Sequence, residues 1–282
     1  MRIIDIDDES LRRLGQWPWP RTRMADLVVG LQSAGPAAIA FDVVFSEADR
    51  TSPKSILGGP NTPVAVARYL AELPDHDEVF AEAIAKGPVV LGFAVSREQT
   101  NAQAPQTKAR FVMLGEAAQP YLHAFSSSVG SLKPLEAAAA GHGAMTFVPD
   151  ADGVVRRVPM LVRQGSTLLP SLSAETLRVA QNATNYTVST EPTPGVGVKD
   201  VRIGRLLIPT NSQGEVWVKY TRPVASRYIP AWKVLAKEVP AEDLEGQILL
   251  IGTSAQGLMD LRFSPMGGVI PGGVTPLRCS SL

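Results

Sequence analysis

The strongest constraint on the fold comes from short apolar segments that alternate with helical patterns near the two ends of the chain. Residues 2–7 and 37–42 are apolar runs that end in carboxylates, and helical patterns over 8–14 and 21–33 separate them. Such runs are typical of buried strands, and strand, helix, strand in succession predicts a parallel crossover unit. Further strands are predicted over 89–95 and 245–251. We therefore expect a parallel βαβ-type sheet built from the N-terminal and C-terminal parts.

The middle of the chain, about 110–220, has a different pattern. Short strand-like runs at 143–148, 154–163, 186–189, 198–203 and 215–220 are separated by turn residues, and one helix is expected over 171–181. Asp152-Gly153 is a hairpin signal. This section is therefore expected to be β-rich and largely antiparallel, either as an insertion or as an extension of the same sheet. The fold class is mixed, α/β with α+β character.

The amino-acid composition argues against several classes of function. The chain has 27 Lys and Arg residues against 27 Asp and Glu residues, so it lacks the basic surplus typical of nucleic-acid binding. Its single cysteine, Cys279, forms no disulfide within the chain and no CxxC zinc site. No run approaches the roughly 20 apolar residues of a membrane span. Because the sequence begins within a predicted strand, we expect it to be a segment of a longer protein.

Acidic residues gather where the first two predicted strands end. Asp5, Asp7 and Asp8 end the first strand, Asp42 ends the second, and Glu47, Asp49 and Arg50 follow. Ligands of open parallel sheets bind beyond the carboxyl ends of the strands, so these carboxylates converge if the two strands are neighbours. Asp5, Asp7 and Asp42 would then hold Ca²⁺, Mg²⁺ or an amine. The alternative is that the carboxylates cap helices and pair with Arg21, Arg23, Arg50 or Arg262.

A second candidate site follows the last predicted strand. The segment 251–257, IGTSAQG, offers backbone N–H groups and the hydroxyls of Thr253 and Ser254 to an anion. It lacks the P-loop lysine and the spacing of a nucleophile elbow, and the alternative is a tight turn. The three histidines, His76, His123 and His142, are far apart. We assign no catalytic residue.

Five segments in order resemble the CHASE2 domain, and the resemblance runs over about 2–272. They are IDIDDES (4–10), WPWPR (17–21), AFDVVFSE with DR (40–50), PDADGVVRR (149–157) and LIGTSA with GL and DLR (250–262). The resemblance implies a single sensor domain over 1–272. It also implies an atypical tail over 273–282, where the family pattern continues toward the membrane.

The resemblance further implies an extracytoplasmic input domain of a bacterial membrane receptor. Membrane helices would flank the domain, and the output would be an adenylate or guanylate cyclase, a histidine kinase or a Ser/Thr kinase. The ligand would be an unidentified small molecule or ion, and the receptor a homodimer. The family supplies no functional residues, so the ligand-binding candidates rest on the residues alone. They are Asp5, Asp7, Asp8, Asp42, Glu47, Asp49, Arg50, Thr253, Ser254, Asp260 and Arg262.

Two other functions fit parts of the sequence. The first is a metal-assisted phosphate-ester hydrolase that uses Asp5, Asp7 and Asp42. The second is a structural module that binds a protein partner through the turn containing Trp17 and Trp19.

Overall fold

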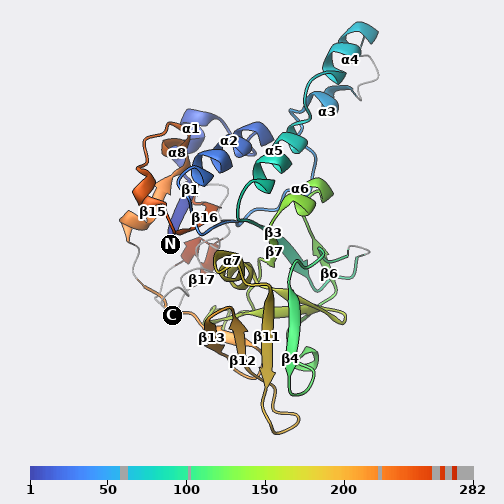
Figure 1. The fold of residues 1–282 in the computed structure, drawn as a ribbon, viewed down its shortest axis with the longest axis vertical. Coiled ribbons are helices and arrows are strands. Elements are labelled where there is room, and N and C mark those ends of the chain that lie inside the picture. Colours follow the sequence, from blue (N-terminus) through green and yellow to red (C-terminus); the bar gives the residue numbers. More distant parts are fainter. Residues whose placement is uncertain (58–62, 101–102, 222–223, 256–260, 264–268, 272–282) are drawn as a thin grey trace.

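The computed structural model describes residues 1–57, 63–100, 103–221, 224–255, 261–263 and 269–271. Its centre is a sheet of parallel strands (Figure 1). In order, these are β15 (Tyr228–Pro230), β1 (Arg2–Ile6), β16 (Ile248–Thr253), β2 (Ala38–Phe41), β3 (Val89–Ser96) and β7 (Gly141–Ala144). The short strand β6 (Ser127–Val129) pairs antiparallel with the end of β3.

Both faces of this sheet are covered by helices, which explains why its strands are mostly apolar. One face packs against α2 (Arg21–Gln32), α5 (His76–Ala85), α6 (Lys133–Ala138) and α8 (Ala231–Leu235). The other face packs against α7 (Leu172–Ala180). Alternate residues of each strand therefore belong to different hydrophobic clusters, as with Ile39 and Ala40.

The first two predicted strands are not neighbours, because β16 lies between β1 and β2. Ile4 is opposite Ile251 on one side of β16, and Leu250 is opposite Ala40 on the other. A strand from the far end of the chain thus takes the central position. This order separates the acidic ends of β1 and β2 by one strand.

The first helix was predicted correctly from the residues around it. Helix α1 spans Asp8–Leu14, and the Asp7 carboxylate accepts a hydrogen bond from Ser10 N at 2.7 Å. Gly15 ends the helix with a φ of 93°, and its N–H donates to the Leu11 carbonyl oxygen. This is the conformation in which glycine is favoured over other residues.

The β-rich middle contains three smaller sheets. The largest has the order β13 (Leu206–Pro209), β12 (Val198–Ile203), β11 (Asn185–Thr190) and β4 (Arg110–Leu114). The others join β10 (Thr167–Pro170), β9 (Leu161–Gln164) and β5 (Ala124–Phe125), and β14 (Glu215–Trp217) with β8 (Arg157–Pro159). Most pairs are antiparallel, and β11–β4 and β5–β9 are parallel. The predicted mixed fold class is confirmed.

The middle section is interleaved with the parallel sheet, because it contributes β7 to that sheet and α7 to its cover. The predicted hairpin at Asp152-Gly153 is not formed. The turn itself is closed, since Gly153 N donates to Asp150 O at 2.9 Å, but β8 after it pairs with β14. The partner of β8 therefore comes from a distant part of the chain and not from the residues before the turn.

The remaining elements are short. Helices α3 (Pro53–Leu57) and α4 (Val64–Ala71) form an arm that projects from the body (Figure 1). Single 3₁₀ turns occur at Gln119–Tyr121, Ala225–Arg227 and Ala241–Asp243. Strands β17 (Leu261–Phe263) and β18 (Val269–Pro271) pair antiparallel.

The packing of α7 on β7 depends on Gly143. A Cβ atom there would lie 2.7 Å from Leu172 N and closer still to Leu172 Cα, which are backbone atoms of α7. We expect Gly143→Ala to displace α7 and to lower the free energy of unfolding by about 2 kcal/mol, measured by urea denaturation. Gly30→Ala is the control, because its Cβ would meet Val234 at an ordinary 3.5 Å. Equal stability of the two variants would contradict this packing.

Candidate functional site

The carboxyl edge of the parallel sheet holds one buried acid, Asp5. Asp5 lies opposite Gly252 in the sheet and is 9% exposed. Its carboxylate accepts hydrogen bonds from Ser254 N at 3.1 Å and from Ser254 Oγ at 2.7 Å. Burial raises the pKa of Asp5, and the charges of Asp7 and Asp8 raise it further, against the opposing effect of the Ser254 hydrogen bonds.

Asp42 lies across β16 from Asp5, on the same face of the sheet. Gly252 separates the two acids, and a Cβ atom on this glycine would be 4.0 Å from Asp42 Cβ. The side chains of Asp5 and Asp42 therefore flank a position that carries no side chain. Asp5 and Asp42 thus lie at one edge of the sheet even though their strands are not neighbours, and Ser254, which was assigned to a separate candidate site, lies beside Asp5.

The expected cation site of Asp5, Asp7 and Asp42 is not formed. The Asp7 carboxylate caps α1, and Asp8 is exposed in the first turn of that helix. Across the described ranges, no group of three or more His, Cys, Asp or Glu residues is arranged to hold a metal ion. The three-carboxylate arrangement on which the hydrolase hypothesis depended is absent from these residues.

The turn after β16 does not form the expected anion cradle from Thr253 and Ser254. The backbone N–H and the hydroxyl of Ser254 both donate to Asp5, and Thr253 Oγ1 donates to Ile6 O at 3.2 Å. The anion that this turn binds is thus the protein's own Asp5 carboxylate. Asp260 lies outside the described residues. Arg262 belongs to β17, and the structure does not describe its side chain.

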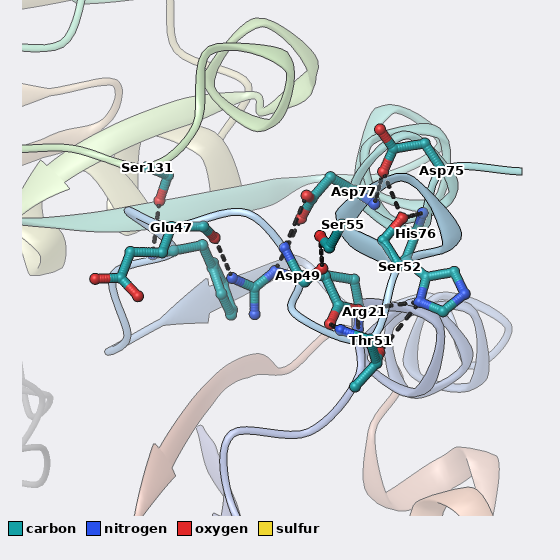
Figure 2. Close-up of polar contacts among 11 residues, drawn as sticks. Arg21, Glu47, Asp49, Thr51, Ser52, Ser55, Asp75, His76, Asp77 and Ser131 are labelled. Carbon is teal, nitrogen blue, oxygen red and sulfur yellow. Dashed lines mark hydrogen bonds and ion pairs between the residues drawn. The ribbon is translucent and has the colours of Figure 1, made fainter. Parts of the chain in front are cut away.

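A second polar group, here called the loop cluster (Arg21, Asp49, Thr51, His76 and Asp77), lies between the starts of α2 and α5 (Figure 2). The Arg21 guanidinium donates to Asp77 Oδ1 at 3.2 Å and to the Glu47 carbonyl oxygen at 3.0 Å. Asp49 N donates to Asp77 Oδ2 at 3.0 Å. Arg21, Asp49 and Asp77 are each buried, at 7%, 5% and 7% exposure. These bonds fasten the loop after β2 to both helices.

The Asp49 carboxylate is the centre of the loop cluster. It accepts hydrogen bonds from Arg21 N at 2.7 Å and from the N–H and the hydroxyl of Thr51, both at 2.8 Å. His76 Nδ1 lies 3.2 Å from Asp49 Oδ2 (Figure 2). Burial alone would raise the pKa of Asp49, but these donors outweigh it, so the pKa is lowered.

Neighbouring residues extend this arrangement along α5. Ser52 Oγ donates to the Asp75 carboxylate at 3.1 Å and accepts from His76 N at 3.2 Å. Asp75 also caps α5, accepting from Asp77 N at 3.0 Å. Sequence reasoning missed Asp77 and His76 as partners of Asp49. The available signal was the segment 75–78, DHDE, in which an acid three residues before a glutamate is typical of a capped helix start.

The other predicted residues of this loop have smaller roles. The side chain of Glu47 is exposed, and only its backbone carbonyl enters the network. Arg50 is exposed. The predicted alternative, in which the acids pair with arginines and cap helices, therefore holds for Asp7 and for the contact of Asp49 with the backbone of Arg21.

The aromatic turn before α2 belongs to the core. Trp19 is 1% exposed, and its indole N–H donates to Gly15 O at 2.8 Å. Trp17 packs edge-to-face on Trp19 at a centroid distance of 5.8 Å. The hypothesis of a partner-binding surface on this turn therefore fails for Trp19, which partners could not reach.

The CHASE2 domain family model matches residues 1–276, and the chain belongs to the CHASE2 family. This is a family of extracytoplasmic sensory domains of signalling receptors. No curated protein and no solved structure matched the chain. Among the described residues, no helix has both the length and the apolarity to cross a membrane.

The hydrogen bonds of Asp49 in the loop cluster should make the stability of the protein depend on pH. Asp49→Asn should lower the free energy of unfolding by about 2 kcal/mol at pH 7, because charge-assisted hydrogen bonds are weakened. Since the folded pKa of Asp49 is lowered, its contribution is complete above the unfolded pKa of about 3.9 and is lost as the pH falls through the folded pKa. Urea denaturation from pH 7 to pH 3 measures this. Glu82→Gln, on the exposed side of α5, is the control, and a loss that does not vary with pH would contradict the prediction.

The raised pKa of Asp5 predicts that its contribution to stability has the opposite pH dependence. Its folded pKa is raised, so its contribution to stability is greatest at low pH and is lost as the pH rises through the folded value. Asp5→Asn should therefore have a higher Tm than the unsubstituted protein at pH 7, with the difference narrowing toward pH 4. Exposed Asp26→Asn is the control. A lower Tm at pH 7, or a Ca²⁺- or Mg²⁺-dependent rise in Tm that Asp5→Asn removes, would show that the carboxylate is needed in its charged form.

Proposed function

We propose that the chain is the ligand-sensing input domain of a membrane-bound signal-transduction receptor. The observation that carries the proposal is the pairing of β1 with β16, in which Ile3 lies opposite Leu250. Segments from near the two ends of the sequence are thus adjacent in the centre of one sheet. A change of geometry at one strand is transmitted directly to the other, and from both to the membrane helices expected beyond them.

The input region in this proposal is the carboxyl edge of the sheet. Asp5, Asp42 and Ser254 lie there, and the loop after β2 carries Asp49, the centre of the loop cluster. Open parallel sheets bind their ligands at this edge. A ligand passes a signal only if it binds two conformations with different affinity. In this proposal the two conformations differ in how the loop after β2 is fastened to α2 and α5.

Three further features belong to the proposal. The domain is located in the periplasm or outside the cell and is anchored by membrane helices. The output is an adenylate or guanylate cyclase, a histidine kinase or a Ser/Thr kinase. The receptor acts as a homodimer, because such output domains work in pairs. The family match supports the extracytoplasmic sensory role, which is the common basis of all three.

A test uses the full-length receptor in its own membrane. Asp42→Ala and Asp49→Asn should change the basal output, or its response to stimulus, by at least about fivefold, which is the lower range of measured couplings between sites. Asp26→Asn is the matched control and should leave the output unchanged. A cysteine placed at exposed Gln213, with Cys279→Ser, should react with a membrane-impermeant thiol reagent in intact cells. Unchanged output at equal receptor levels, or labelling only after lysis, would contradict the proposal.

A further inference from the structure

A cavity of about 610 Å³ lies between the start of β4, the C-terminal end of α7 with the loop after it, and the residue that precedes β7. Its wall includes Ala140, which precedes β7, and the C-terminal end of α7 at Arg178 and Val179. Lys108 and Arg110, at the start of β4, form the remaining side. The volume is in the range of small-molecule sites in proteins. None of the carboxyl-edge residues Asp5, Asp42 and Ser254 lines the cavity.

Three cationic side chains line this cavity, and one of them is neutralised. The Arg178 guanidinium binds Glu175 through two hydrogen bonds of 2.9 and 2.7 Å. It also donates to the carbonyl oxygens of Ala183 at 2.7 Å and Ala140 at 2.9 Å. Arg178 is thus a fixed, 7% exposed part of the wall whose charge is balanced. It holds α7, the strand β7 and the loop after α7 in one arrangement.

The other two cations have no carboxylate partner within the described part of the chain. Lys108 Nζ donates only to the Ala137 carbonyl oxygen, at 3.1 Å, and the Arg110 side chain makes no hydrogen bond or ion pair with any described residue. No Asp or Glu is among the described residues that line the cavity. Two exposed positive charges therefore lie beside a hollow without a compensating carboxylate, which is an electrostatic setting that attracts an anion.

The end of α7 does not cancel this positive character. A helix C-terminus repels anions through its free carbonyl groups. Here the last carbonyls are occupied, since Gln181 N donates to Leu177 O, Asn182 N donates to Val179 O at 3.0 Å, and Ala183 N donates to Arg178 O at 3.0 Å. The Arg110 fork and the Lys108 ammonium remain as the exposed recognition groups.

We propose that this cavity binds a small anion carrying a phosphate or carboxylate group. Arg110 would contact two of its oxygens in a fork, and Lys108 would act as a point charge on a third. Both residues precede or begin β4, whereas α7 covers the parallel sheet, so a bound anion joins the two sheets. Binding itself is independent of the proposed function, and only its use as a sensory input rests on that function.

The test is isothermal titration calorimetry of the whole chain at low salt, with inorganic phosphate and with malonate as the probes. We expect millimolar or tighter binding of at least one probe, weakened about tenfold or more by Arg110→Gln and by Lys108→Gln. Arg202→Gln is the matched control, because Arg202 is exposed on β12 of the same sheet and lies outside the cavity. It removes the same charge and should leave the affinity unchanged.

A parallel arm uses phosphatidylglycerol vesicles to separate the two sources of phosphate. Vesicle binding that Arg110→Gln weakens and Arg202→Gln does not would assign the anion to a lipid headgroup. Absence of binding to phosphate, malonate and vesicles, or equal weakening by the Arg110 and Arg202 substitutions, would overturn the proposal. Because these experiments measure binding to the chain alone, their failure would leave the receptor-output test unaffected.

Discussion

The insertion of β16 between β1 and β2 is the constraint on which the rest of the structure depends. Backbone N–H and C=O groups in a buried sheet must be paired on both sides. The strands near the N-terminus pair with one another only through β16, which binds β1 on one edge and β2 on the other. The sheet is therefore completed by residues more than two hundred positions away. The N-terminal helices pack on a surface that exists only once β16 is in place.

The same insertion builds the carboxyl edge. Ser254 follows β16 and donates both of its hydrogen bonds to Asp5, and Gly252 leaves the space between Asp5 and Asp42 without a side chain. A buried carboxyl with a raised pKa here contrasts with Asp49, whose pKa is lowered by several donors. The two acids are at the same end of the sheet in opposite electrostatic environments. This contrast gives the edge two groups whose ionisation affects stability in opposite directions.

Much of the local structure could be predicted. The cap at Asp7 and the stop at Gly15 bound α1, and the strand over 198–203 matches β12. These features depend on neighbours within a few residues. The missed elements, such as β15 and α6, are short and lack a distinctive pattern, so only their packing stabilises them. For the site, convergence of Asp5 and Asp42 was expected if their strands were neighbours, and Ser254 was assigned to a separate candidate site. Asp77 and His76 were not linked to Asp49, because α5 is brought to the loop only by its packing on the sheet.

The sequence by itself determined where many of the strands and helices lie, that the parallel strands are buried, and which family the chain resembles. The strands and helices follow from the spacing of apolar residues and from helix caps. The family resemblance follows from five motifs that occur in the family's order. The tertiary structure decided the order of the strands. It also decided that Ser254 donates its hydrogen bonds to Asp5 and that the loop cluster forms around Asp49. It also placed Lys108 and Arg110 beside Arg178. Strand order and side-chain pairing depend on contacts between distant residues, which arise only when the buried surfaces of the whole chain are satisfied together.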